Sequence, residues 1–347
     1  MKHRITKQIA AISCAVLLGM GSVSIDAAAV SLVAVDLADV VDATAPSVVE
    51  VFTETKQVSR MFREYVTEGA GSGVILTENG YLVTNNHVVE GASTIRVRLS
   101  NGQAYPAVLA GTDAKTDLAV LKIEASGLPA AKLADSAKVR AGDFVIAIGN
   151  PLGELGGTVT EGIISAKDRQ VTIDGQSMTL LQTSAAVNPG NSGGGLFNLN
   201  GELVGVVNSK TSGSDIEGLA FAIPANTVKT IVQQLIQNGY VAGRPQLGVS
   251  IMQLNSAYYQ YQGVYIAQSM AENGLQAGDY ILKIDGKAVT SFADVSAILD
   301  QHQVGDTVTV TVLRGGREMA VRVKLTEQKP SQYGMELDSG AEIPALL

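Results

Sequence analysis

The sequence is poor in the residues that disulfide bridges, metal sites and nucleic-acid binding require. It contains one Cys, three His and no Trp in 347 residues, and its formal net charge is −8. One Cys cannot form an intramolecular disulfide, and so few Cys and His side chains leave little for a zinc site. An acidic chain without a basic run is also a poor partner for phosphate backbones. We therefore expect no metal, no cofactor and no nucleic-acid ligand.

Charged residues are scarce as well, at 17% of the chain, whereas 46% of the residues are hydrophobic. This balance excludes an intrinsically disordered chain and supplies enough apolar side chains for packed cores. The 37 Gly and the low aromatic content of 5% favour short strands and tight turns. With about 150 residues in a typical domain, the length predicts two domains once a leader is set aside.

The N-terminus has the pattern of a targeting segment. A basic start is followed by an almost uncharged apolar run from Ile9 to Ile25, and Ala27-Ala28-Ala29 then offers a cleavage site. We predict a signal peptide over residues 1–29, which contains Cys14, and a linker over residues 30–45. The alternative is a retained membrane anchor, for which 17 apolar residues are at the short limit. Both alternatives predict an exported protein, periplasmic or otherwise extracytoplasmic, whose membrane association would involve the N-terminus only.

Residues 46–238 show a β-rich pattern. Short apolar runs flank three Asn-Gly pairs, Asn79-Gly80, Asn101-Gly102 and Asn200-Gly201, and such a pair between apolar runs is a strong hairpin signal. Leu118–Ile123 and Phe144–Ile148 are typical of short buried strands. Many hairpins without a long helical period predict an antiparallel sandwich or a pair of barrels.

The pattern changes near Ala225. Apolar residues at helical spacing predict an amphipathic helix that ends before Gly239, and a linker follows at Gly243-Arg244-Pro245. A second domain, over residues 243–327, alternates predicted strands with one helix that opens on a capping box of Ser291 and Asp294. The tail over residues 328–347 shows no period, and we predict that it is flexible.

Three polar residues of the first domain lie beside apolar strands. His87 follows one strand, Asp117 precedes another, and Ser192 stands in the run Asn188-Pro189-Gly190-Asn191-Ser192-Gly193-Gly194. A serine hydroxyl needs a base to become nucleophilic, and the base needs a carboxylate to orient it. Glycines beside the serine leave backbone N–H groups free to stabilise an oxyanion. These residue types together indicate nucleophilic catalysis.

Other interpretations of these residues are weaker. Taken alone, His87 and Asp117 would each be read as structural residues. The serine run matches the Gly-x-Ser-x-Gly elbow of α/β-hydrolases, but that elbow opens a helix and precedes its histidine, whereas here a hairpin follows and His87 comes first. Gly69-Ala70-Gly71-Ser72-Gly73 lacks the lysine ending of a phosphate-binding loop and is read as a tight strand entry.

Several motifs resemble the HtrA (Deg) family of serine proteases. They cover about residues 46–326 and include these segments: 81–89 with Thr84-Asn85-Asn86-His87, 116–122 with Thr116-Asp117, Gly149-Asn150-Pro151, 188–194, Phe221-Ala222-Ile223-Pro224, Gln246-Leu247-Gly248-Val249 and 274–279. The resemblance implies a mostly β fold, with a chymotrypsin-like double β-barrel followed by a smaller α+β PDZ domain. It also implies His87 as general base, Asp117 as its orienting carboxylate and Ser192 as nucleophile.

The same resemblance implies three further sites. The turn of Gly190, Asn191 and Ser192 would supply the oxyanion hole from its backbone N–H groups. A small apolar specificity pocket would be formed by Ala185, Ala186, Leu219, Ala220, Phe221 and Ala222. The peptide groove of the PDZ domain would be formed by Gln246, Leu247, Gly248, Val249, Val295, Ile298 and Leu299. Ser184 and Ala220 depart from the family pattern, which usually has Asp and Gly there, so the selectivity and activation of the site are affected rather than the triad.

The sequence therefore predicts an exported serine endopeptidase that hydrolyses unfolded or damaged proteins and binds peptide C-termini at its PDZ domain. Family members commonly form homotrimers, and we expect the same here. The alternative is a chaperone that binds unfolded peptides without cutting them. The complete set of His87, Asp117 and Ser192 favours the protease.

Overall fold

The computed structural model describes residues 36–58, 64–149, 158–173, 176–188, 190–209, 219–254, 263–270 and 272–329. The predicted leader over 1–29, Cys14 within it and the tail from residue 330 lie outside the described residues. The same holds for Asn150, Pro151 and Pro189 of the family motifs.

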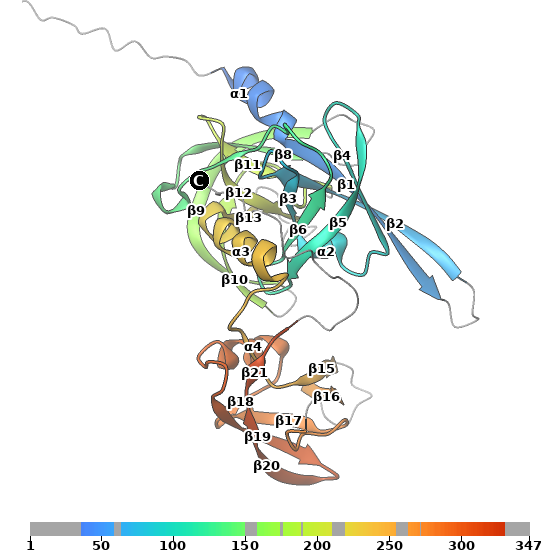
Figure 1. The fold of residues 1–347 in the computed structure, drawn as a ribbon. Coiled ribbons are helices and arrows are strands. Elements are labelled where there is room, and N and C mark those ends of the chain that lie inside the picture. Colours follow the sequence, from blue (N-terminus) through green and yellow to red (C-terminus); the bar gives the residue numbers. More distant parts are fainter. Residues whose placement is uncertain are drawn as a thin grey trace, which may run out of the picture. The chain divides into compact units, whose positions relative to one another are not determined.

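The first half of the N-terminal region, residues 46–238, is a closed β-barrel (Figure 1). Its strands are β1 (Val48–Val58), β2 (Glu64–Ile75), β3 (Tyr81–Thr84), β4 (Thr94–Arg98), β5 (Ala104–Asp113) and β6 (Leu118–Ile123). They pair in the order β1-β2-β3-β6-β5-β4, and β1 pairs with β4 to close the ring. The Asn79-Gly80 hairpin joins β2 to β3 as predicted, with Gly80 at φ +101°. Successive side chains alternate between the two faces of the barrel wall, and both faces of β3 and β6 are buried: Leu82 and Leu121 pack in one apolar cluster, and Val83 and Val120 pack in another.

The second half closes as a second barrel. Its strands are β7 (Lys132–Leu133), β8 (Phe144–Gly149), β9 (Thr158–Ile173), β10 (Gln176–Thr183), β11 (Gly195–Asn198), β12 (Glu202–Asn208) and β13 (Ala220–Pro224). The order is β11-β8-β9-β10-β13-β12-β7, and an additional pairing of β11 with β12 joins the two sides. The predicted double β-barrel is confirmed. Strand β9, with 16 residues, is longer than the short strands that the pattern predicted.

The structure differs from the predicted linker over residues 30–45. Helix α1 (Leu37–Thr44) occupies most of its second half, and a 3₁₀ turn, η1 (Ala45–Ser47), follows. Asp36 caps the helix, since its carboxylate accepts a hydrogen bond from the Ala38 N–H at 2.9 Å. Val40 is 7% exposed and packs with the core residues of the N-terminal region, so this segment belongs to the folded domain.

Three further helical segments belong to the N-terminal region: α2 (Asn86–Val89), η2 (Ser136–Lys138) and α3 (Ala225–Asn238). Helix α3 is the amphipathic helix that the sequence predicted. Its apolar face, with Val228 and Leu235, joins the core, and Gly239 ends it in the left-handed conformation at φ +78°.

The C-terminal domain is a small α+β unit. Its strands are β14 (Pro245–Gln246), β15 (Val249–Leu254), β16 (Gly263–Ser269), β17 (Tyr280–Ile284), β18 (Lys287–Ala288), β19 (Thr307–Arg314), β20 (Arg317–Lys324) and β21 (Thr326–Glu327). The main sheet has the order β15-β16-β17-β19-β20, and β14 pairs with β21. Helix α4 (Phe292–Leu299) starts at the predicted capping box, in which Ser291 and Asp294 each accept a backbone N–H of the other residue.

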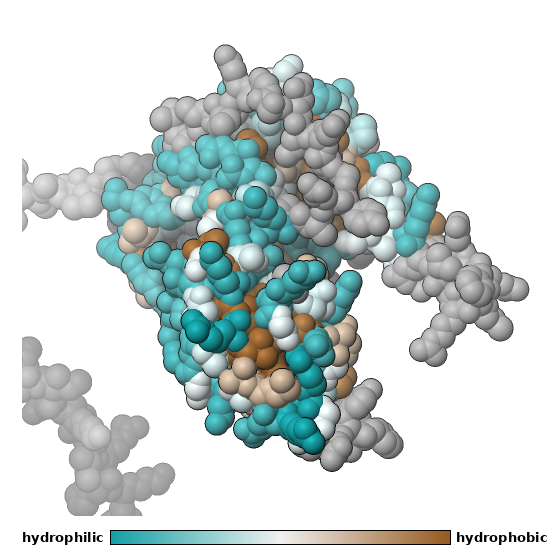
Figure 2. Space-filling view, turned by 60° about the horizontal axis from the view of Figure 1, so that its bottom comes forward, coloured by the Kyte–Doolittle hydropathy of each residue, from teal (hydrophilic) through white to brown (hydrophobic). Residues whose placement is uncertain are grey.

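The face of the molecule shown in Figure 2 is largely hydrophilic where the residues are described. Apolar side chains gather in one area bordered by polar residues on the face shown in Figure 2. A contiguous apolar area on a soluble domain commonly marks a binding surface.

Candidate active site

The fold brings together the three residues that the sequence singled out. His87 lies on α2, directly after β3, Asp117 lies in the turn between β5 and β6, and Ser192 lies between β10 and β11. His87 Nδ1 is 2.6 Å from Asp117 Oδ2, and His87 Nε2 is 3.0 Å from Ser192 Oγ. The first barrel thus supplies the imidazole and the carboxylate, and the second barrel supplies the hydroxyl. Both contacts lie at the junction of the barrels.

Asp117 is held in a strained backbone conformation. Its φ of +53° lies in the left-handed region, which non-glycine residues rarely adopt. The main chain is fixed there because the Asp117 carbonyl accepts hydrogen bonds from Asn85 Nδ2 at 3.0 Å and from the Asn86 N–H at 3.1 Å. The His87 N–H also donates to Asp117 Oδ1 at 3.0 Å. The short helix that carries His87 is therefore bonded to the carboxylate that orients its ring.

Asn208 is a site residue that sequence reasoning missed. It is fully buried at the end of β12, and its Nδ2 donates to Asp117 Oδ2 at 2.9 Å. An Asn at a strand end carries no local signal of such a contact. Asn208 and Asp117 are 91 positions apart in the sequence, and only the folding of the chain brings their side chains together. The carboxylate therefore has donors from both barrels.

The geometry fixes the tautomer of His87. An ionised carboxylate can only accept hydrogen bonds, so the proton shared with Asp117 resides on Nδ1. In the neutral ring Nε2 is then the acceptor, and it faces the hydroxyl of Ser192. This arrangement can take the proton of Ser192 without any rearrangement of the ring.

Ser192 lies in a tight turn that its glycines make possible. The Asn191 N–H donates to the Asn188 carbonyl at 3.0 Å, and Gly190 has φ +102°. A positive φ at the third position of a hydrogen-bonded turn is the type II pattern, which favours glycine. Ser72 holds this turn from the first barrel, since its hydroxyl donates to the Gly190 carbonyl at 2.6 Å and its N–H donates to the Ser192 carbonyl at 2.8 Å.

The turn leaves two of its three N–H groups available. Among the described residues, the N–H groups of Gly190 and Ser192 donate to no acceptor, whereas the Asn191 N–H is used within the turn. The sequence-based prediction included all three residues in the oxyanion hole, and Asn191 has to be removed from it. Its side chain is fully buried instead, and neither its Oδ1 nor its Nδ2 has a described partner.

The six residues predicted to form one specificity pocket do not all face one side. Along β13, successive side chains alternate between the two faces of the sheet. Ala222 packs in the same apolar cluster as Ala185, whereas Phe221 packs in a different cluster with Leu219 against it. Ala186 is exposed. The alternation along β13 allows Ala220 and Ala222 to form a pocket floor together with Ala185. Leu219 and Phe221 lie on the opposite face of the sheet.

The two departures from the family pattern are both accommodated in the sheet. Ser184 makes a reciprocal pair of bonds with Ile163, since its N–H donates to the Ile163 carbonyl and its Oγ accepts the Ile163 N–H, each at 3.1 Å. Ala220 is 3% exposed and pairs with Thr183. Neither residue contacts the three polar residues at the junction of the barrels through a described hydrogen bond.

The C-terminal domain carries a groove of about 360 Å³ between β15 and α4. Its apolar lining includes these residues: Leu247, Val249, Ile251, Phe292, Val295 and Leu299. Gln246 also lines it, but Gly248 and Ile298, both predicted here, do not. Ile298 is 5% exposed and faces the domain core, because it lies on the inner side of α4.

The mouth of this groove offers unpaired backbone donors. The N–H groups of Leu247 and Gly248 donate to no acceptor among the described residues. Gly248 has φ +68°, and its carbonyl accepts the Met270 N–H at 2.9 Å. A loop with such free N–H groups at the end of an apolar groove can bind a carboxylate.

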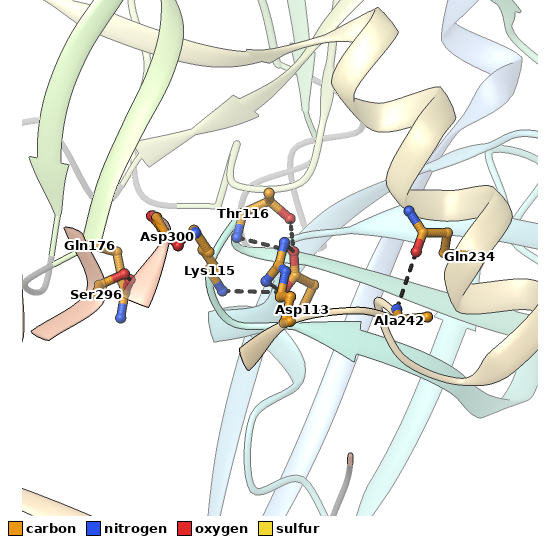
Figure 3. A network of polar contacts seen from close by, with 9 residues as sticks. Asp113, Lys115, Thr116, Gln176, Gln234, Ala242, Ser296 and Asp300 are labelled. Atoms are coloured by element: carbon orange, nitrogen blue, oxygen red, sulfur yellow. Dashed lines mark hydrogen bonds and ion pairs between the residues drawn. The ribbon is translucent and has the colours of Figure 1, made fainter. Parts of the chain in front are cut away.

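Polar residues of the N-terminal region line the same groove. Lys115 forms an ion pair with Asp300, which follows α4, and the Ser296 hydroxyl donates to Gln176 Oε1 at 3.1 Å (Figure 3). Lys115 is two residues before Asp117 in the chain. The groove and the carboxylate that orients His87 are thus linked through one short turn.

No group of three or more His, Cys, Asp or Glu side chains is arranged to hold a metal ion within the described ranges. In the same ranges, no helix has the length and apolar character that crossing a bilayer requires.

Comparison with known proteins assigns both regions. Residues 71–206 match the model of a trypsin-like peptidase domain, and residues 245–325 match that of a PDZ domain. The chain is 44% identical over 285 residues to the serine protease Do-like HtrA of Lactobacillus helveticus, covering 75% of this chain and 69% of that protein. It is 40% identical over 277 residues to the periplasmic serine endoprotease DegP of Escherichia coli (strain K12), covering 76% of this chain and 58% of that protein.

A solved structure supports the same assignment. A variant of the HtrA-type protease AlgW with a decapeptide superimposes with a TM-score of 0.62 at 32% identity, over 86% of this chain and all of the other.

Proposed function

Because the chain belongs to the HtrA family of serine proteases, we propose that it hydrolyses internal peptide bonds of unfolded or damaged proteins. The catalytic residues are His87, Asp117 and Ser192. The observation that carries this proposal is the unbroken series of hydrogen bonds from Asp117 Oδ2 through the His87 ring to Ser192 Oγ, at 2.6 and 3.0 Å.

The reaction begins with acylation. His87 Nε2 takes the proton of Ser192 as its Oγ attacks the carbonyl carbon of the substrate, and the carbonyl electrons move to the oxygen. The N–H groups of Gly190 and Ser192 stabilise this oxyanion, because neither donates to an acceptor within the described part of the chain. The C–N bond then breaks, and the imidazolium returns the proton to the leaving amine. Asp117 stabilises the imidazolium throughout.

Deacylation repeats these steps with water. His87 takes a proton from the water molecule, whose oxygen attacks the ester carbonyl, and the same oxyanion donors act again. The proton returns to Ser192 Oγ as the C–O bond breaks and the acid is released. The Asn208 bond to Asp117 at 2.9 Å keeps the carboxylate facing the ring in both halves of the cycle.

The test is hydrolysis of unfolded casein by the purified chain and by Ser192→Ala, His87→Ala and the double variant. We expect each single change to lower turnover by about 10⁴–10⁶, magnitudes measured in other serine proteases, and the double variant to be little worse. Binding of casein without cleavage by the wild-type chain would instead support the non-proteolytic chaperone, and unchanged cleavage by Ser192→Ala would refute the assignment of the nucleophile.

We further propose that the PDZ groove binds peptide C-termini with an apolar last residue. The N–H groups of Leu247 and Gly248, which donate to no acceptor among the described residues, would donate to the carboxylate, and the apolar lining with Val295 and Leu299 would surround the side chain. Calorimetry with a peptide ending in Val and with its C-terminal amide tests the contact. Equal affinity for the acid and the amide would contradict it.

For the protease domain we propose cleavage after small apolar residues such as Val, Ala, Ile or Leu. No Asp or Glu occurs from Ser184 to Asn191, so no carboxylate of this segment would pair with a Lys or Arg of the substrate. Sequencing of casein fragments provides the measurement, and cuts mainly after Lys or Arg would overturn this preference.

We also propose an exported, extracytoplasmic homotrimer. The named relative DegP is described as periplasmic, and the predicted leader over 1–29 agrees with export. Fractionation of expressing cells shows whether the chain leaves the cytoplasm and whether it stays on the membrane. Sedimentation equilibrium gives the mass of the assembly, and a monomer at micromolar concentration would exclude a stable trimer.

A further inference from the structure

Ser192 has a second neighbour besides His87. Ser209 lies directly after β12, half-buried, and its hydroxyl is hydrogen-bonded to Ser192 Oγ. The Ser209 N–H also donates to Ser192 Oγ, at 3.3 Å. Ser209 belongs to none of the sequence motifs described above, and the catalytic roles of His87, Asp117 and Ser192 do not involve it.

Proton counting sets the direction of these bonds. A serine hydroxyl has one proton and two lone pairs. The proton of Ser192 goes to His87 Nε2, because the other ring nitrogen already donates to Asp117. Both lone pairs of Ser192 Oγ therefore accept, one from the Ser209 hydroxyl and one from the Ser209 N–H. This leaves the oxygen in one orientation, with its proton toward the base.

We propose that Ser209 is a positioning residue for the nucleophile, a role that rests on the proposed function. Its hydroxyl holds Ser192 Oγ in the rotamer that faces His87 and remains bonded while the oxygen reacts. The bond from the Ser209 N–H is the weaker one at 3.3 Å and gives way to the substrate.

The electron count during attack agrees with this division. When the Ser192 proton moves to Nε2, the electron pair of the broken O–H bond stays on Oγ, which then has three pairs. One forms the bond to the carbonyl carbon, one faces the imidazolium, and one continues to accept the Ser209 hydroxyl. The hydroxyl therefore also stabilises negative charge that develops on Oγ.

The strand that carries Ser209 is tied firmly to the nucleophile turn. The Gly193 N–H donates to the Val207 carbonyl at 3.0 Å, and the Val207 N–H donates to the Gly194 carbonyl at 2.9 Å. Asn208, between Val207 and Ser209, contacts Asp117 at the other end of the triad. A donor that acts by positioning needs such a rigid support, because an error of about 1 Å removes much of the benefit.

The experiment compares Ser209→Ala, which removes only the hydroxyl, with Ser209→Thr, which keeps it. Ser177→Ala is the matched control, since the Ser177 hydroxyl is exposed and its described partner is Gln170 in the β9–β10 hairpin. The measurements are kcat and KM on a chromogenic peptide, the pH profile of kcat/KM, and the rate of inactivation by a small fluorophosphonate. The fluorophosphonate reports on Ser192 with little contribution from peptide binding.

We expect Ser209→Ala to lower kcat and the inactivation rate by the same factor, about 3- to 10-fold, which corresponds to one hydrogen bond in the reacting state. KM and the acid limb of the pH profile stay unchanged, since Ser209 contacts neither His87 nor Asp117 through a described bond. Ser209→Thr restores most of the rate, and Ser177→Ala equals the wild type.

Equal or faster inactivation of Ser209→Ala, with an active wild type, would overturn this inference alone; a faster rate would mean that the hydroxyl caps the nucleophile. A wild-type chain that neither cleaves peptide nor reacts with the fluorophosphonate would overturn the proposed function, and this inference with it.

Discussion

The turn before Asp117 depends on one buried carboxylate. The Asp113 side chain is 5% exposed and forms an ion pair with Arg244, which also bonds Asp113 Oδ2 through Nη2 at 2.7 Å. Asp113 accepts the Thr116 hydroxyl and the N–H groups of Lys115 and Thr116, both at 3.3 Å (Figure 3). Asp113 is thus the hub of the turn that leads into the strained backbone of Asp117.

Replacing Asp113 and replacing Arg244 should lower the free energy of unfolding by different amounts. Asp113→Ala removes every bond of the turn to this carboxylate and leaves the Arg244 guanidinium, 19% exposed, without its partner. We expect a loss of about 3–5 kcal/mol in the free energy of unfolding, the range for one broken partner of a buried pair. Arg244→Ala leaves the carboxylate with its donors from the turn, so we expect about 1–3 kcal/mol. Turnover should fall in the same order, because Asp117 loses its support.

Urea unfolding followed by circular dichroism measures the stabilities, and casein hydrolysis measures turnover. The double variant should be more stable than the sum of the single changes predicts, by about 0.5–3 kcal/mol, because the pair is counted twice in that sum. Lys115→Ala is the control, since its ion pair with the half-exposed Asp300 is worth at most about 1 kcal/mol. Strict additivity, or a smaller loss for Asp113→Ala than for Arg244→Ala, would refute the assignment of Asp113 as the hub.

Three further outcomes follow from the structure. Gly193→Ala should abolish hydrolysis and lower the melting temperature, because Gly193 has φ +83° and an added Cβ would lie 2.2 Å from the Ser72 carbonyl oxygen. A melting temperature equal to that of the wild type would show that the turn accommodates the Cβ atom. Burial raises the pKa of the Asp279 carboxyl, whereas the hydrogen bonds from Arg314 and a backbone N–H lower it. The lowering is the larger effect, so the pKa of Asp279 lies below its usual range. The Asp279 carboxylate therefore stabilises the folded state at pH values above its unfolded pKa of about 3.9. This contribution is lost as the pH falls through the lower pKa of the folded state. Urea midpoints at pH 7 and pH 3 should show this loss, and Asp279→Asn should show less of it. Asn191→Leu should keep or raise the melting temperature, because it replaces a buried amide without described partners, whereas Asn191→Asp should lower it by burying a charge; the reverse order would indicate a partner for the amide.

The sequence by itself determined the local elements and the chemistry. The Asn-Gly hairpin of β2 and β3, the amphipathic period of α3 and the capping box of α4 are local signals, and the structure contains all three. His87, Asp117 and Ser192 were identified because residue type, order and flanking motifs are also local information. The double barrel followed from the family resemblance rather than from the hairpins alone, which left a sandwich open.

Only the tertiary structure decided which groups meet across the barrels. Asn208, Ser209 and Arg244 have no sequence signal that links them to the site, since each reaches it from a strand or linker distant in the chain. The sequence pattern also did not predict which face of an element each side chain occupies. On β13, Phe221 and Ala222 lie on opposite faces, and on α4, Ile298 faces the domain core. The physical reason is the same in each case. Hydrogen bonds and burial depend on distances in space, and the packing of two closed barrels sets those distances between residues that no sequence window contains together.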